Sequence, residues 1–144
     1  MSAENVEIVR KWWTGASEWF NDPNENDPER LAEISAEYAA EDIVYEEDPV
    51  WPDASSYRGQ DAILKRFLEY FDVLGMRRIE IGEIIDAGDL VFLEFRAHMG
   101  LGAEGENVSF LWGYTVRVEK GRVVHFRAWF DPEEGRRAAG LSSS

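Results

Sequence analysis

Three consecutive carboxylates stand in the stretch VYEEDPVW, residues 44–51, where a strand should end. Val44 and Tyr45 favour a strand, whereas Pro49 cannot continue a ladder of backbone hydrogen bonds. A carboxylate that the fold turns into an apolar interior can take up and return a proton, which is the task of a general base. The alternative is that all three acids lie at a solvated strand end.

Strand geometry limits which of the three acids can point inward together. Successive side chains of a strand point to opposite faces, so Glu46 and Asp48 share one side. Tyr45 and Glu47 share the other side. Glu47 and Asp48 could both point inward only if a bulge interrupts the strand.

Length and composition predict one domain, residues 1–144, that can bury a real core. The net charge is −14, and no basic run exceeds two residues, so we expect neither nucleic acid nor a membrane surface as partner. The chain has no cysteine, which excludes disulfides and thiolate chemistry. The first residues lack the apolar core of a signal peptide, so a cytoplasmic location is expected.

Hydrophobic spacing predicts helices in the first half of the chain and strands in the second. Helical spacing recurs at 3–20, after Asp27, and at 60–74, with one short strand at 43–47 and a loop at 49–59. After Gly75 the pattern alternates, and four strands are predicted at 77–86, 89–99, 107–118 and 122–130. Asp131 should cap a short last helix, and the tail 141–144 should be disordered. This order indicates an α+β fold with helices on one face of a curved antiparallel sheet.

Alternation gives the strands one apolar, aromatic face that must meet the helices. This inner face either forms a filled core or lines a pocket at the open end of the sheet. The residues expected to line such a pocket are Trp13, Trp51, Tyr57, Phe67, Phe95, Ala97, Phe110, Trp112, Phe126, Ala128 and Phe130.

The opposite, outer face of the sheet is mixed in character and no predicted helix covers it. It carries Arg96, His98, His125, Arg127 and Trp129. Half-apolar sheet faces of this kind often pair with a second subunit, so a homodimer is expected. No metal site is expected, because the arginines beside the two histidines would repel a cation.

The stretch GLGAEG, residues 100–105, matches the glycine pattern of dinucleotide-binding loops. That fingerprint requires a helix after the loop, so that the helix N-terminus meets the pyrophosphate. Here a strand is predicted to follow, and Glu104 would face the phosphates. We therefore interpret the stretch as a hairpin loop and expect no nucleotide or other cofactor.

The order of elements resembles the cone-shaped fold of the nuclear transport factor 2 (NTF2) superfamily, in particular its SnoaL-like branch. The stretch YAAEDIVYEEDPVWPDASSYRGQDAILKRF is similar to the second helix, first strand, loop and third helix of that branch. The ending GYTVRVEKGRVVHFRAWFDPEEGRRAAGL resembles its last hairpin and terminal helix. The superfamily holds isomerases, cyclases and binders without catalytic activity. The resemblance therefore implies one fold but leaves several functions open.

The triplet Glu47-Asp48-Pro49 is similar to the one that carries the catalytic aspartate of the ketosteroid isomerases in this superfamily. The resemblance implies that Asp48 is the base, although counting forward from Asp42 puts Glu47 at that position. The second oxyanion donor of those enzymes falls near Tyr114, which could take that role as a substitute.

Three functional readings follow from this resemblance. The first is a cofactor-free isomerase or cyclase that shuttles a proton on a small apolar carbonyl compound, with a carboxylate and Tyr114 in the site. The second is a binder of an apolar small molecule without catalysis. The third is a dimeric interaction domain whose cone is filled by its own side chains.

Overall fold

The computed structural model describes residues 2–21, 27–51, 53–101 and 106–141 of the chain. Its elements are α1 (Ser2–Asn21), α2 (Pro28–Tyr38), β1 (Ala39–Glu46), β2 (Ser56–Arg58), α3 (Gln60–Leu74), β3 (Met76–Asp86), β4 (Val91–Leu101), β5 (Glu106–Glu119), β6 (Arg122–Trp129) and α4 (Pro132–Ala138). The predicted α+β class is confirmed. The tail that was expected to be disordered lies, for residues 142–144, outside the described residues.

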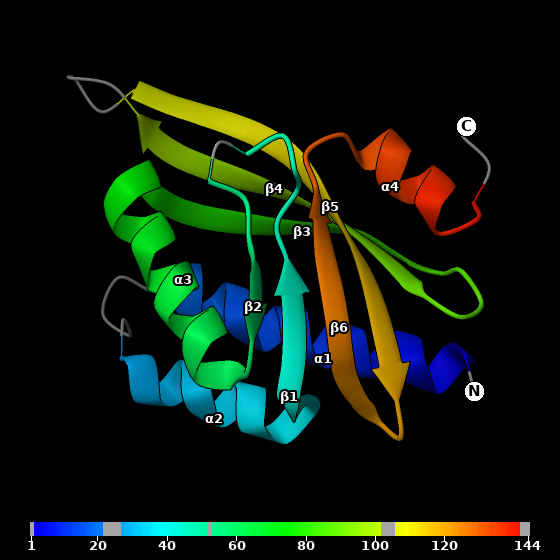
Figure 1. The fold of residues 1–144 in the computed structure, drawn as a ribbon. Helices are drawn as coiled ribbons and strands as arrows, with labels where there is room; N and C mark the ends of the chain where they lie inside the picture. The colour runs from blue at the N-terminus through cyan, green and yellow to red at the C-terminus, as the bar shows by residue number, and fades with distance from the viewer. Residues whose placement is uncertain (1, 22–26, 52, 102–105, 142–144) are drawn as a thin grey trace.

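The six strands form one mixed sheet in the order β2-β1-β6-β5-β4-β3. β1 runs parallel to β6, with Tyr45 opposite Phe126, and the other neighbours are antiparallel. Figure 1 shows α1, α2 and α3 gathered on one side of the curved sheet and α4 on the other. The first and last strands along the chain are thus direct neighbours, and the short β2 lies at the edge of the sheet beside β1.

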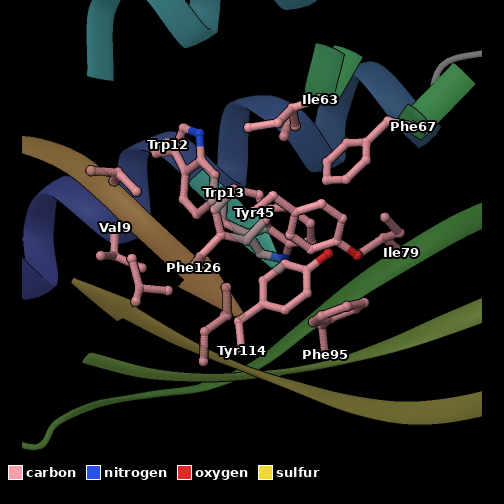
Figure 2. Packing of buried hydrophobic residues seen from close by; sticks show 14 of the residues in the cluster. Val9, Trp12, Trp13, Tyr45, Ile63, Phe67, Ile79, Phe95, Tyr114 and Phe126 are labelled. Atoms are coloured by element: carbon pink, nitrogen blue, oxygen red, sulfur yellow. The ribbon is translucent and has the colours of Figure 1, made fainter. Parts of the chain in front are cut away.

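The core lies between α1 and the inner face of the sheet. Val9, Trp13, Ala16 and Phe20 recur at helical spacing on α1, and all four are buried. The ring of Trp13 lies 5.0 Å from that of Tyr114, centroid to centroid, in an edge-to-face arrangement. Figure 2 shows these rings packed with their neighbours in one cluster. The cone is therefore closed at its base by aromatic contacts.

The expectation that no helix covers the outer face is wrong at one end of the sheet. Phe92 points outward on β4, yet it is fully buried because α4 lies over it. The Arg136 guanidinium sits 4.9 Å from the centre of the Phe92 ring. A Cβ on Gly135 would lie only 3.0 Å from both Phe92 and Trp129, so glycine lets α4 approach this closely.

Two local predictions need correction. The loop expected at 49–59 contains β2, which pairs with β1 and places Tyr57 opposite Tyr45. Three residues are too few for alternation to reveal a strand. β1 itself begins at Ala39, directly after α2, rather than at residue 43.

The glycine-rich stretch joins two antiparallel strands, although residues 102–105 lie outside the described part of the chain. β4 precedes it and β5 follows it, with Leu101 opposite Glu106. The helix that a dinucleotide-binding loop requires is therefore replaced by a strand.

Within the described residues, no helix combines the length and the apolar character needed to cross a bilayer. The cytoplasmic location and the single-domain organisation stay predictions from the sequence.

The predicted cap of the last helix is confirmed and gives a direct test. The Asp131 carboxylate accepts a hydrogen bond from the Glu133 amide at 3.0 Å. Asp131→Ala should lower the free energy of unfolding by about 1 kcal/mol, because that amide loses its partner. Denaturant unfolding measures the change, and Asp131→Asn, which can still cap, should retain most of the stability. Equal stability of Asp131→Ala and wild type would contradict the capping role.

Candidate functional site

Glu47 follows the last residue of β1 and is buried, with only 3% of its side chain exposed. Its Oε2 accepts hydrogen bonds from Arg66 Nε at 2.7 Å and from the Tyr70 hydroxyl. Its Oε1 has only longer contacts, with the Ser55 amide at 3.3 Å and the Tyr57 hydroxyl at 3.5 Å. The two oxygens of one carboxylate are therefore held unequally.

Arg66 and Tyr70 reach Glu47 from α3, where they stand one helical turn apart and share a face. Arg66 also pairs with Glu69 at 3.2 Å, and its guanidinium lies 5.0 Å from the centre of the Tyr70 ring. Burial lowers the pKa of the Arg66 guanidinium, but the hydrogen bond and the charge of Glu47 outweigh this and raise it overall. Arg66 is thus a fixed positive charge beside Glu47.

Asp48 is also buried, but both of its oxygens are committed to the backbone. Oδ1 accepts from the Val50 amide at 3.0 Å, and Oδ2 accepts from the Phe130 amide at 2.9 Å. The first bond shapes the turn after β1, and the second ties that turn to the end of β6. Both acids avoid solvent because the strand ends at Glu46, so strand alternation no longer governs Asp48.

A row of tyrosine hydroxyls leads from Glu47 into the core. The Tyr45 and Tyr70 hydroxyl oxygens lie 2.9 Å apart. Burial raises the pKa of Tyr70, and the hydrogen bond to Glu47 raises it further. Burial raises the pKa of Tyr114 well above the ordinary value, and the proximity of Tyr45 raises it further. Figure 2 shows the hydroxyl oxygens of Tyr45 and Tyr114 turned to the same side of the cluster.

A small cavity adjoins Glu47 at the open end of the cone. It is lined by Tyr45, Glu47, Asp48, Trp51, Tyr70, Trp112, Ala128 and Phe130. The volume open to the centre of a water molecule is about 10 Å³, which is room for about one water. The Trp112 and Phe130 rings are stacked with centroids 5.0 Å apart, and Trp51 meets Phe130 edge to face. Any larger molecule requires these aromatic walls to separate.

A second, apolar cavity lies deeper, between the three N-terminal helices and the sheet. Its volume by the same measure is about 30 Å³, and Trp13, Phe67 and Phe126 are among its walls. Of the residues predicted to line a pocket, these three border the deeper cavity. Trp51, Trp112, Ala128 and Phe130 border the cavity beside Glu47.

The remaining predicted pocket residues lie elsewhere. Phe95 and Ala97 are buried in the core, and Tyr57 contacts Glu47 from β2. Phe110 is 43% exposed and borders neither of these two cavities, because it stands on β5 beyond the helices. Tyr114 lies within the core, connected to Glu47 only through other tyrosines. The catalytic roles of Glu47, Asp48 and Tyr114 stay predictions.

Sequence reasoning missed Arg66 and Tyr70, the two strongest partners of Glu47. The signal was present in their spacing, because residues four apart on a helix present one face. That face also carries Phe67, and this apolar neighbour made the stretch look like ordinary core packing. Only the folded structure shows that this face of the helix meets the end of β1.

Comparison with known proteins gives a family and a fold. A model of the SnoaL-like domain matches residues 16–126. An NTF2-like protein of unknown function from Burkholderia pseudomallei is similar in structure, with a TM-score of 0.66 at 19% identity over 93% of this chain and 95% of that one. A search of the curated proteins found no significant match.

Two further solved structures are similar over most of the chain. One is a putative SnoaL-like polyketide cyclase from Mesorhizobium loti, with a TM-score of 0.64 at 20% identity over 85% of this chain and 96% of that one. The other is a protein with a ketosteroid isomerase-like fold from Catenulispora acidiphila in complex with trimethylamine, with a TM-score of 0.64 at 15% identity and 94% coverage of both chains. At these identities the likeness shows the fold alone.

The buried tyrosines predict a specific alkaline transition. Burial raises the pKa of Tyr45, Tyr70 and Tyr114 above the ordinary value of 10.0, so the folded state resists their ionisation. The stability this contributes is complete below pH 10 and is lost as the pH rises above it, because the unfolded chain ionises first.

Tyrosinate absorbance followed together with circular dichroism measures this effect. Of the five tyrosines, the half-buried Tyr38 and Tyr57 should ionise while the fold is intact, and the other three only as it unfolds. Ionisation of all five before any loss of secondary structure would contradict the buried row.

Proposed function

Because this chain belongs to the SnoaL-like domain family, we propose that it transfers a proton, without a cofactor, on a small apolar carbonyl compound. Glu47 is the proton acceptor in this proposal. The observation that carries it is a buried carboxylate that borders a cavity walled by aromatic rings. A carboxylate in such surroundings is the base that abstraction of a proton next to a carbonyl requires.

The unequal hydrogen bonding of Glu47 supports Oε1 as the reacting oxygen. Oε2 is occupied by Arg66 and Tyr70, whereas Oε1 has only contacts of 3.3 Å and 3.5 Å. The proton therefore arrives at Oε1. The Tyr57 hydroxyl stands next to that oxygen, and burial raises the pKa of Tyr57, so it remains a donor at neutral pH. In this proposal, once the aromatic walls of the cavity separate, the Tyr57 hydroxyl turns from Glu47 to the oxygen of the carbonyl substrate as negative charge develops there.

Asp48 has a supporting role in this proposal. Its two oxygens hold the Val50 and Phe130 amides, so both are engaged in fixing the backbone. By joining the turn after β1 to the end of β6, it sets where Trp51 and Phe130 stand. The substrate enters by displacing Trp51, which is only half-buried.

A second candidate function is the binding of a small organic cation without catalysis. Aromatic faces attract alkylammonium groups, and the cavity beside Glu47 combines five aromatic residues with two carboxylates. The related Catenulispora protein in complex with trimethylamine supports this alternative.

Exchange of carbonyl α-protons with deuterium separates the two functions. A panel of small cyclic and aromatic ketones in heavy water, followed by NMR, should include compounds whose α-protons exchange faster with the wild-type protein. Glu47→Gln should slow this exchange at least about a hundredfold, since general bases contribute that much. Asp48→Asn is the matched control and should fold and keep most of the exchange.

The other outcomes of this experiment are equally decisive. Exchange lost in Asp48→Asn but kept in Glu47→Gln would move the role of base to Asp48. Binding of trimethylamine together with no exchange for any ketone would favour the second candidate.

We further propose that the chain forms a homodimer through the uncovered part of the outer sheet face. Leu111 is 39% exposed there and stands opposite Arg96. The Arg127 guanidinium lies 3.8 Å from the centre of the Trp129 ring, whose Nε1 donates to Thr115 at 3.0 Å. A rigid tryptophan and arginine beside an exposed leucine are typical of interface anchors.

Light scattering at micromolar concentration tests the dimer. Wild type should have the mass of two chains, and Leu111→Asp should have the mass of one, because a charge would be buried against its own copy. Lys11→Asp is the control, since Lys11 is exposed on α1, on the helix-covered side of the sheet (Figure 1). A monomeric wild-type protein would refute the dimer.

A further inference from the structure

Three tyrosine hydroxyls are buried in a core that aromatic rings otherwise fill. Tyr45, Tyr70 and Tyr114 are 1%, 6% and 2% exposed. Phe126 stacks on Tyr45 at 4.6 Å, and Phe95 lies 4.8 Å from Tyr114, centroid to centroid. Phenylalanine would fill the same space without burying a polar group, which is unfavourable unless the group is hydrogen-bonded. The hydroxyls therefore call for an explanation beyond packing.

The chemistry of the groups fixes the direction of their hydrogen bonds. An ionised carboxylate only accepts, so Tyr70 donates its single hydroxyl proton to Glu47. Tyr70 must then accept from Tyr45, at 2.9 Å. Tyr45 uses its own proton on Tyr70, so it can only accept from the neighbouring Tyr114 hydroxyl, whose ring centre lies 6.3 Å from that of Tyr45. We call Tyr70, Tyr45 and Tyr114 the tyrosine chain, in which each hydroxyl can donate only toward Glu47.

We propose that the tyrosine chain acts as one unit that orients the Glu47 carboxylate by holding its Oε2, so that Tyr45 and Tyr114 are positioning residues for a base that neither of them contacts. Hydrogen bonds in series polarise one another, and a low-dielectric core enhances the effect. Tyr114 on β5 and Tyr45 on β1 thereby act on Glu47 through Tyr70 on α3. The inference rests on the proposed role of Glu47 and extends the site into the core.

The chain also accounts for the inequality of the two Glu47 oxygens. Tyr70 and Arg66 both hold Oε2, and the tyrosines behind Tyr70 strengthen its bond. Oε1 is thereby left as the oxygen that receives the proton. When it does, the charge on the carboxylate disappears and the whole row of bonds weakens together.

NMR of protein labelled with ¹³C at the glutamate carboxyl groups tests the chain directly. The Glu47 resonance is assigned by its absence in Glu47→Gln. Tyr45→Phe and Tyr114→Phe should both move it, although Tyr114 is separated from Glu47 by two hydroxyls. Tyr38→Phe removes a hydroxyl outside the chain and should leave the resonance in place.

Deuterium exchange of a ketone substrate gives the second readout. Tyr45→Phe should slow exchange about tenfold and Tyr114→Phe less, as is common for outer partners of a reactive group. Tyr114→Phe is the safer variant if Tyr45→Phe fails to fold, because it removes the terminal donor and leaves no unpaired proton. Circular dichroism confirms that each variant is folded.

The outcomes separate this inference from the proposed function. If Tyr114→Phe folds and leaves the Glu47 resonance unmoved, the chain is refuted even where Glu47→Gln abolishes exchange. If Tyr114→Phe moves the resonance but Glu47→Gln retains exchange, the chain stands and the proposed catalytic role fails.

Discussion

One buried charge organises the open end of this cone. Glu47 is almost without solvent contact, and an isolated carboxylate in such a place would be strongly unfavourable. Arg66 compensates the charge from α3, and the Ser55 amide approaches from the segment before β2. Removing one partner of a buried ion pair typically costs on the order of 3–5 kcal/mol. The positions of α3 and β2 relative to β1 are thus coupled through one side chain.

The aromatic core and the polar site are continuous rather than separate layers. Tyr45 stacks on Phe126 through its ring and contacts Tyr70 through its hydroxyl. Glu47 follows Tyr45 by two positions in the sequence. A residue that packs on one side and hydrogen-bonds on the other transmits a shift of the sheet to the carboxylate. The aromatic core therefore serves as a support for Glu47, and the cavity that this carboxylate borders lies at the rim of the cone.

Much of the fold was readable from the sequence because local patterns were strong. The third helix was predicted with both of its ends, since apolar spacing begins after Gly59 and Gly75 stops it. Gly75 has a φ of +60°, and a Cβ there would lie 2.8 Å from the Gly100 carbonyl oxygen. The cap at Asp131 was equally visible, because capping depends on neighbours within a few residues.

The site was less readable because its geometry depends on contacts between distant segments. Alternation along β1 left open which of Glu47 and Asp48 points inward. Arg66 lies nineteen positions from Glu47 and meets it only because α3 crosses the end of β1. The burial of Phe92 likewise depends on α4, far along the chain. Patterns of residue type and spacing carry no information about contacts between segments that are far apart in the sequence.

The parallel pairing of β1 with β6 has a consequence for how the molecule forms. Tyr45 pairs with Phe126, and Asp48 bonds the Phe130 amide across 82 positions of sequence. During synthesis, β1 leaves the ribosome long before β6 exists. The edge of β1 that pairs with β6 therefore stays unpaired until β6 has been synthesised. Contacts of such long range slow folding, since a large loop must close before they contribute. The mouth of the cone therefore cannot form before the chain through Phe130 is complete, and a nascent chain lacking β6 has no place to hold Asp48.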